Sequence, residues 1–155
     1  MFYAFLNHIF FKMGSSEDSL TQKHDLTISA KNITLEVVDV SENMVKINSN
    51  CAGQVNGTLY SGSYNDTVEA IMMPDGTLAL TIRYIHMTNR GEAIWGKGIG
   101  SRGVPDTKAI ARLTAEGTMW TSAPRLSQLN GKGWIVEGEY NIKEDSFEVR
   151  QQFHS

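Results

Sequence analysis

The chain has 155 residues, a formal net charge of −3 and a single cysteine, Cys51. This length fits one domain whose core needs no disulfide to be stable. The basic residues are scattered and form no stripe, so the composition argues against a nucleic-acid-binding protein. A lone cysteine cannot form an intramolecular disulfide, and it favours a reducing, cytoplasmic location.

The N-terminal part of the chain differs from the rest. Residues 1–12 are mostly apolar, but they are too few to span a bilayer and lack the basic start of a signal peptide. One interpretation is that they anchor the protein to a membrane or a partner. The other is that they result from an upstream start codon or form a short helix packed on the domain. Because residues 2–11 are too apolar to lie free in water, we expect them to pack on the domain or on a second subunit, as in a homo-oligomer.

Residues 14–25 are polar and indicate a linker. The predicted organisation is therefore an N-terminal extension over residues 1–25 and one β-barrel domain over residues 26–155.

Short segments of alternating polarity follow the linker, separated by turn sequences. The predicted strands cover residues 33–40, 44–48, 57–64, 67–73, 77–88, 107–121, 133–142 and 147–153, and a further, glycine-rich strand lies within residues 91–103. Residues 50–54 are predicted as a loop, and Asn65-Asp66 as a turn. The strongest turn signals are Pro74-Asp75-Gly76 and Asn89-Arg90-Gly91, where glycine supplies a positive φ.

The predicted strand after residue 91 carries Gly96, Gly98 and Gly100 at alternate positions, so one of its faces is nearly bare. A bare face allows sharp coiling, lets a neighbour's large side chain lie across it, or lets a ligand approach closely. A phosphate-binding loop is excluded because Lys97 is followed by Gly98, not by serine or threonine, and no helix follows.

The alanines in residues 107–121 would suit a helix. We predict a strand, because the segment continues without a helix stop and the glycine-rich strand needs a partner. About eight or nine short strands without a long helix predict an all-β chain, folded as a single antiparallel up-and-down barrel.

A family resemblance covers roughly the last two-thirds of the chain. It is carried by the order of six short motifs, namely residues 57–64, 67–70, 74–76, the alternating glycines at 96–100, 129–131 and 136–137. In this order they resemble a group of uncharacterised prokaryotic proteins that are similar to the allene oxide cyclase barrel, within the broader lipocalin-like architecture. The resemblance implies a barrel fold and no particular activity.

Two glutamates are candidate catalytic residues. Glu69 and Glu137 lie in the middle of predicted strands among apolar neighbours, and a carboxylate is costly to bury unless it is paired or used. Either could transfer protons in a barrel mouth with a raised pKa. The alternative is that both face solvent or pair with Arg83, Arg112 or Arg150.

Glu69 is the preferred catalytic candidate because it lies within one of the family motifs. We expect it to face the barrel interior, near Tyr60 or Tyr84.

Aromatic residues and one histidine are candidate ligand-binding residues. The set is Tyr60, Tyr64, Tyr84, His86 and Trp95, with Trp120 and Trp134 as further candidates. They could line an apolar ligand cavity or simply fill the barrel core. No second histidine or cysteine stands at metal-ligand spacing from His86, so the sequence predicts no metal site, and it indicates no cofactor.

Two classes of function remain. The first is a barrel that binds a small apolar ligand. The second is a cavity enzyme, an isomerase, cyclase or lyase, that uses a buried carboxylate together with a tyrosine.

Overall fold

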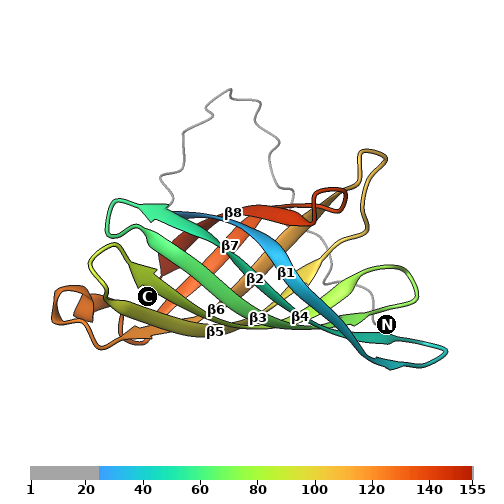
Figure 1. Cartoon of the computed structure of the whole chain (residues 1–155), viewed down its shortest axis with the longest axis horizontal. Coiled ribbons are helices and arrows are strands. Elements are labelled where there is room, and N and C mark those ends of the chain that lie inside the picture. Colours follow the sequence, from blue (N-terminus) through green and yellow to red (C-terminus); the bar gives the residue numbers. More distant parts are fainter. Residues whose placement is uncertain (1–24, 155) are drawn as a thin grey trace, which may run out of the picture.

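The computed structural model describes residues 25–154, so the predictions made for residues 2–11 lie outside the described residues. Eight antiparallel strands form one closed up-and-down barrel, in which β1 pairs with β8 (Figure 1). The strands are β1 (Leu26–Val40), β2 (Val45–Gly57), β3 (Gly62–Met72), β4 (Leu78–Thr88), β5 (Ala93–Arg102), β6 (Ile110–Thr121), β7 (Lys132–Asn141) and β8 (Ser146–His154). A 3-10 helix, η1 (Pro124–Leu129), joins β6 to β7. Within the described residues no helix is long and apolar enough to cross a membrane.

The predicted fold class is confirmed, and the differences concern strand limits. β1 begins at Leu26, and its first residues, Leu26–Lys31, pair with β8 and close the barrel. β2 runs unbroken through residues 50–54, so the predicted loop there is wrong. The predicted turn at Asn65-Asp66 is wrong as well, because both residues lie inside β3. Polar residues at these positions looked like turn residues, but a strand tolerates them where they face water or find partners inside.

Both strong turn predictions are confirmed. Gly76 and Gly91 have φ values of 85° and 77°, which only glycine adopts without strain. Each residue sits in a tight connection between antiparallel neighbours, β3–β4 and β4–β5.

The bare face of the glycine-rich strand lies inside the barrel, with the large side chains of its neighbours lying across it. A Cβ on Gly96 would lie 2.4 Å from the Tyr84 hydroxyl, and one on Gly98 would lie 2.5 Å from the Trp134 ring. Residues 110–121 form a strand beside β5, as predicted, since the bare strand requires a hydrogen-bonding partner.

The two ends of the barrel differ. At the end drawn on the left in Figure 1, η1 closes the barrel, with Leu126 and Leu129 fully buried. Arg125 fastens this helix by a bidentate ion pair with Glu92, at 2.6 and 3.0 Å, and by a 3.2 Å hydrogen bond to the Leu59 carbonyl. The opposite end carries the β1–β2, β3–β4, β5–β6 and β7–β8 connections, and no helix of residues 25–154 lies across it (Figure 1).

Candidate functional site

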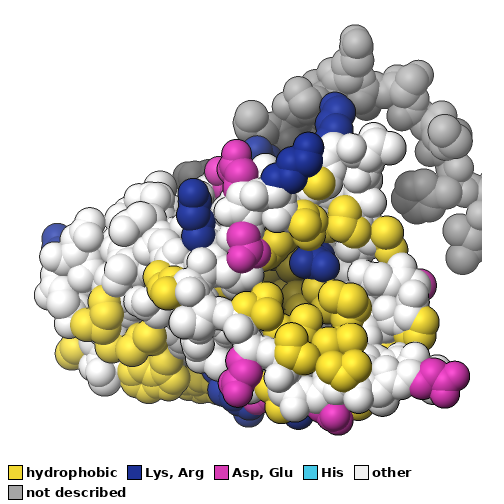
Figure 2. Space-filling model, turned by 45° about the vertical axis from the view of Figure 1, so that its right-hand side comes forward, with side chains coloured by type: hydrophobic (Ala, Val, Ile, Leu, Met, Phe, Trp, Pro, Cys, Tyr) yellow, Lys and Arg dark blue, Asp and Glu magenta, His cyan; other side chains and the backbone are white. Residues whose placement is uncertain are grey.

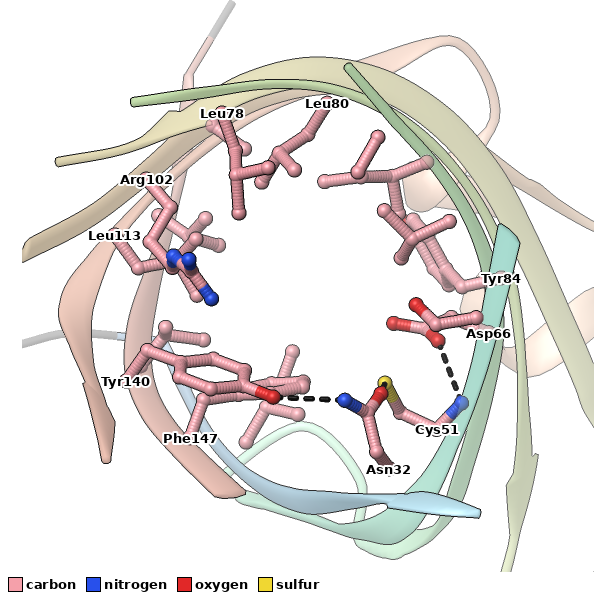
Figure 3. A pocket seen from close by; sticks show the side chains of 18 of the residues that line it. Asn32, Cys51, Asp66, Leu78, Leu80, Tyr84, Arg102, Leu113, Tyr140 and Phe147 are labelled. Carbon is pink, nitrogen blue, oxygen red and sulfur yellow. Dashed lines mark hydrogen bonds between the residues drawn. The ribbon is translucent and has the colours of Figure 1, made fainter. Parts of the chain in front are cut away.

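A cavity of about 300 Å³ lies inside the barrel toward the end without the helix. All eight strands contribute to its wall, which is mainly aliphatic and aromatic. In Figure 2, which turns this end toward the viewer, hydrophobic side chains surround a hollow and a basic side chain lies within it. Figure 3 shows the lining side chains projecting toward the barrel axis. The barrel therefore combines a filled end with an end that encloses space.

One wall of the cavity holds a buried carboxyl group. Asp66 is 8% exposed and accepts two hydrogen bonds, from the Tyr64 hydroxyl at 2.5 Å and from the Cys51 backbone N–H at 3.0 Å. Burial raises the pKa of Asp66, and these two hydrogen bonds oppose the rise without cancelling it. Asp66 therefore holds its proton more tightly than an ordinary aspartate and can exchange it inside an apolar cavity.

A second polar cluster connects β1 with the β7–β8 turn. Asn32 donates from Nδ2 to the Tyr140 hydroxyl at 2.7 Å and to Asp145 Oδ1 at 2.8 Å. Tyr140 also donates to Asp145 Oδ1. The Cys51 thiol donates to Asn32 Oδ1 at 2.9 Å, and burial raises the pKa of this thiol well above its ordinary value. Cys51 therefore stays a thiol at neutral pH and does not have the character of a nucleophile.

Arg102, the last residue of β5, is the one lysine or arginine among the described residues that line the cavity. Its guanidinium carbon lies 5.1 Å from the centre of the Tyr140 ring, a cation–π contact. Its Nε is buried without a hydrogen bond, and none of the ion pairs among residues 25–154 includes it. Burial lowers the pKa of Arg102, while Tyr140 and Asp145 act in the opposite direction. The group remains a cation, with donors uncommitted.

The deep end of the cavity is aromatic. Tyr84 and Trp134 line it, and their rings meet edge to face with centroids 5.7 Å apart. Below them, Tyr60 and His86 do not line the cavity, and the Tyr60 hydroxyl lies 2.8 Å from His86 Nδ1. His86 is 0% exposed, and burial lowers its pKa to about 3, so the ring is neutral at physiological pH.

The structure separates the predicted site residues into three groups. Tyr64 and Tyr84 line the cavity, and their role in ligand binding stays a prediction. Tyr60 and His86 are buried beneath it in the core. Trp95 lies on the outer face of β5 and is 41% exposed, so it does not line the cavity.

The prediction that Glu69 faces the interior with a raised pKa is wrong. Glu69 lies on the outer face of β3 and pairs with Arg83 at 2.7 Å, and this arginine lowers the pKa of Glu69. Glu137 likewise faces outward and pairs with Arg112 at 3.3 Å. Both faces of β3 are apolar, so the sequence pattern could not indicate which one is inside. The alternative of solvent-exposed, arginine-paired glutamates describes both residues.

The sequence analysis missed the polar residues that do face the cavity, and two of them had a signal. Asp66 follows Tyr64 by two residues and so shares its face, but assigning it to a turn hid this relation. Arg102 continues the series of Gly96, Gly98 and Gly100 on the inner face of β5. The contacts of Asn32 with Tyr140 and Asp145 join distant parts of the chain, and no sequence pattern indicates them.

Within the described part of the chain, no group of three or more histidine, cysteine, aspartate or glutamate side chains is arranged to hold a metal ion.

Comparisons with known proteins support the fold. No family model matches the chain, and no curated protein matches it. Several solved structures are similar. A protein of unknown function from Clostridium acetobutylicum has a TM-score of 0.72 at 17% identity, over 85% of this chain and 95% of that chain. A conserved protein of unknown function from Rhodopseudomonas palustris has a TM-score of 0.71 at 17% identity, over 85% of this chain and 96% of that one.

Two further structures share the architecture. A β-barrel-like protein from Acinetobacter baumannii has a TM-score of 0.67 at 16% identity, covering 83% of this chain and 91% of its own. An enzyme from Penicillium herquei has a TM-score of 0.56 at 19% identity, covering 84% and 95%. At these identities the similarity extends to the barrel fold, which uncharacterised proteins and at least one enzyme share.

Proposed function

We propose that the protein binds a small, mainly apolar molecule inside the barrel. The observation that supports this most is the cavity of about 300 Å³ with a mainly hydrophobic wall. Its volume is at the lower end of the range for small-molecule sites, roughly 300–1,000 Å³. An eight-stranded barrel is just wide enough for its own side chains to fill it, so space of this size inside one needs a cause.

Small side chains are the cause. Gly98 and Gly100 on β5 present no side chain to the interior, and Ala115 on β6 faces inward beside them. In the same row of paired residues, beyond Leu80 of β4, Ala70 of β3 is also small and lines the cavity. Tyr84 and Trp134 occupy the glycine face only in its deeper part, which leaves the space beside Gly100 and Ala115 to a ligand.

The experiment is a fluorescence titration with N-phenyl-1-naphthylamine, an uncharged apolar dye. The wild-type protein should bind it with saturation at one site. Ala70→Phe should abolish this binding, because the added ring occupies the cavity. Ala79→Phe is the matched control, since Ala79 faces outward on β4 one position along the same strand pair. Dye binding that survives Ala70→Phe, or that is lost equally in both variants, would contradict the proposal.

A second candidate is a cavity enzyme of the isomerase, cyclase or lyase type. What favours it is Asp66, a carboxyl group with a raised pKa that is hydrogen-bonded to Tyr64 within the cavity wall. Such a group can transfer a proton to or from a bound substrate. The two candidates differ in one measurement, which is the chromatographic retention time of a ligand that co-purifies with Asp66→Asn and is then mixed with the wild-type protein. Isomerisation and cyclisation change the retention time of a molecule and leave its mass unchanged. An enzyme converts the ligand, and Asp66→Asn stops the conversion while keeping the binding. A binding protein leaves the ligand unchanged.

A further inference from the structure

We propose that the molecule bound in the cavity is an amphipathic monoanion, whose carboxylate Arg102 binds at the mouth while its apolar part lies against the barrel wall. This inference rests on the proposed function, because it names the class of ligand for the same cavity.

Arg102 stands in an apolar setting. In the sheet it lies between Leu78 of β4 and Leu113 of β6, and both of these leucines line the cavity. Figure 3 shows its guanidinium group projecting from the wall that faces Asp66 and Tyr84 across the cavity. A guanidinium group carries five N–H donors in a planar fork, and placing it among leucines is costly unless an anion or acceptors engage it. Among the described residues Arg102 has the Tyr140 ring as a contact and no anionic partner.

The two acids of the cavity wall are already engaged elsewhere. Asp145 accepts hydrogen bonds from Asn32 and Tyr140. Its charge acts on Arg102, but the two side chains form no ion pair. Asp66 accepts from Tyr64 and from the Cys51 backbone. Each carboxyl group therefore has its own donors, while the donors of Arg102 remain free for a ligand. A carboxylate matches the guanidinium fork with two parallel hydrogen bonds.

The dimensions of the cavity limit the rest of the ligand. Arg102 and Gly98 are four positions apart on β5, which is about 13 Å along a strand. Trp134 lies against Gly98 and ends the cavity at that depth. A medium-chain fatty acid or an aryl-substituted carboxylic acid fits this length and volume, whereas a long-chain fatty acid exceeds both.

The test compares decanoate with 1-decanol, which have the same chain length and differ in charge. Both are titrated into the full-length protein as competitors of N-phenyl-1-naphthylamine. Decanoate should bind more tightly than decanol to the wild type, and more weakly as ionic strength rises. Arg102→Met should raise the dissociation constant of decanoate by roughly tenfold or more and leave that of decanol within about twofold, as expected from losing a charge-assisted hydrogen bond.

Arg112→Met is the matched control. It removes the same charge from the adjacent strand, but Arg112 faces outward and pairs with Glu137, so both dissociation constants should stay unchanged. If Arg102→Met does not fold, Arg102→Lys serves instead, because it keeps the charge and loses the fork. The dissociation constant of decanoate for this variant should then lie between the wild-type value and ten times that value. It should still rise with ionic strength.

The possible failures are distinguishable. If the dye binds but decanoate displaces it no better than decanol, or Arg102→Met weakens both equally, the anion inference is wrong and ligand binding stands. If the dye does not bind at all, the proposed function itself fails.

Discussion

The Tyr64 hydroxyl donates a 2.5 Å hydrogen bond to Asp66 Oδ2 inside the barrel, across two positions of the same strand. Alternate residues of a strand share a face, so the two side chains project together into the cavity. This is a buried carboxyl group beside a tyrosine, the arrangement that the sequence analysis predicted for Glu69. It arises three residues earlier, on the other face of β3.

Asp66→Asn should stabilise the protein at neutral pH. Burial raises the pKa of Asp66, so the folded state binds the proton more tightly than the unfolded state. The free energy of unfolding therefore falls as pH rises from the unfolded pKa, about 3.8–3.9, through the raised folded value. Asparagine keeps the shape and does not titrate. The variant should unfold at a higher temperature than wild type at pH 8, with a difference that shrinks toward pH 4.

Glu69→Gln is the control for this measurement. Glu69 is exposed and paired with Arg83, and such surface pairs contribute little. Its unfolding temperature should stay close to that of wild type across the same range. A lower unfolding temperature for Asp66→Asn at pH 8 would mean that the hydrogen bonds to the ionised carboxylate outweigh its burial, contrary to the prediction.

Gly98→Ala should lower the free energy of unfolding by about 1–3 kcal/mol, the usual cost of overpacking a core. The new methyl group would lie 2.3 Å from the Glu116 carbonyl oxygen and 2.5 Å from the Trp134 ring. Gly103→Ala is the matched control, since its nearest neighbour would be the Arg112 carbonyl oxygen at 3.8 Å. Urea denaturation of both variants measures the difference. Equal stability of the two would show that the sheet adjusts to the methyl group and that Trp134 does not need the bare face.

Local features of the sequence predicted most of this fold. Alternating polarity located the strands, and glycines at Gly76 and Gly91 located the turns, because both effects depend on a few adjacent residues. The bare face of β5 predicted a neighbour's large side chain lying across it, which Tyr84 and Trp134 provide. Closure through Leu26–Lys31 was missed, since pairing with β8 joins the two ends of the barrel and leaves no local mark.

The candidate site was harder to predict. Choosing the inner face of β3 requires knowing which face the other strands cover, and Val68, Ala70 and Met72 are as apolar as Ile71 and Met73. Because the wrong face of β3 was taken as the inner one, Glu69 was predicted as the buried carboxyl group instead of Asp66. Arg102 could have been placed from its position on the glycine face. Its lack of an anionic partner among residues 25–154 depends on where each acid of that part of the chain lies.

Arg125→Met should loosen the closed end of the barrel without affecting the cavity. The side chain joins η1 to Glu92 and to the Leu59 carbonyl, so its loss removes three hydrogen bonds that hold the helix in place. Backbone amides of residues 125–129 should exchange with deuterium faster than in wild type, as measured by mass spectrometry. Dye affinity should not change, because the cavity opens at the other end.

Arg83→Met, on the outer wall, is the control and should leave exchange in this segment as it is. Unchanged exchange in Arg125→Met would mean that the burial of Leu126 and Leu129 alone holds η1 in place.

The pH dependence of stability below neutrality should depend strongly on His86. Burial lowers its pKa to about 3, whereas the unfolded chain has the ordinary value of 6.5. Between these two values the unfolded state binds the extra proton, so stability is complete above about pH 6.5 and is lost as pH falls toward 3. This one group can contribute up to about 1.4 kcal/mol per pH unit to that loss.

His86→Gln removes the titration. It should lower stability at pH 7, because His86 accepts or donates a hydrogen bond with Tyr60 and packs on Tyr84. The decisive measurement is the slope of the free energy of unfolding between pH 6 and 4.5, which should be shallower in the variant than in wild type. Parallel curves for the two proteins would mean that the folded barrel admits a proton to His86, and that the end closed by η1 is open to water.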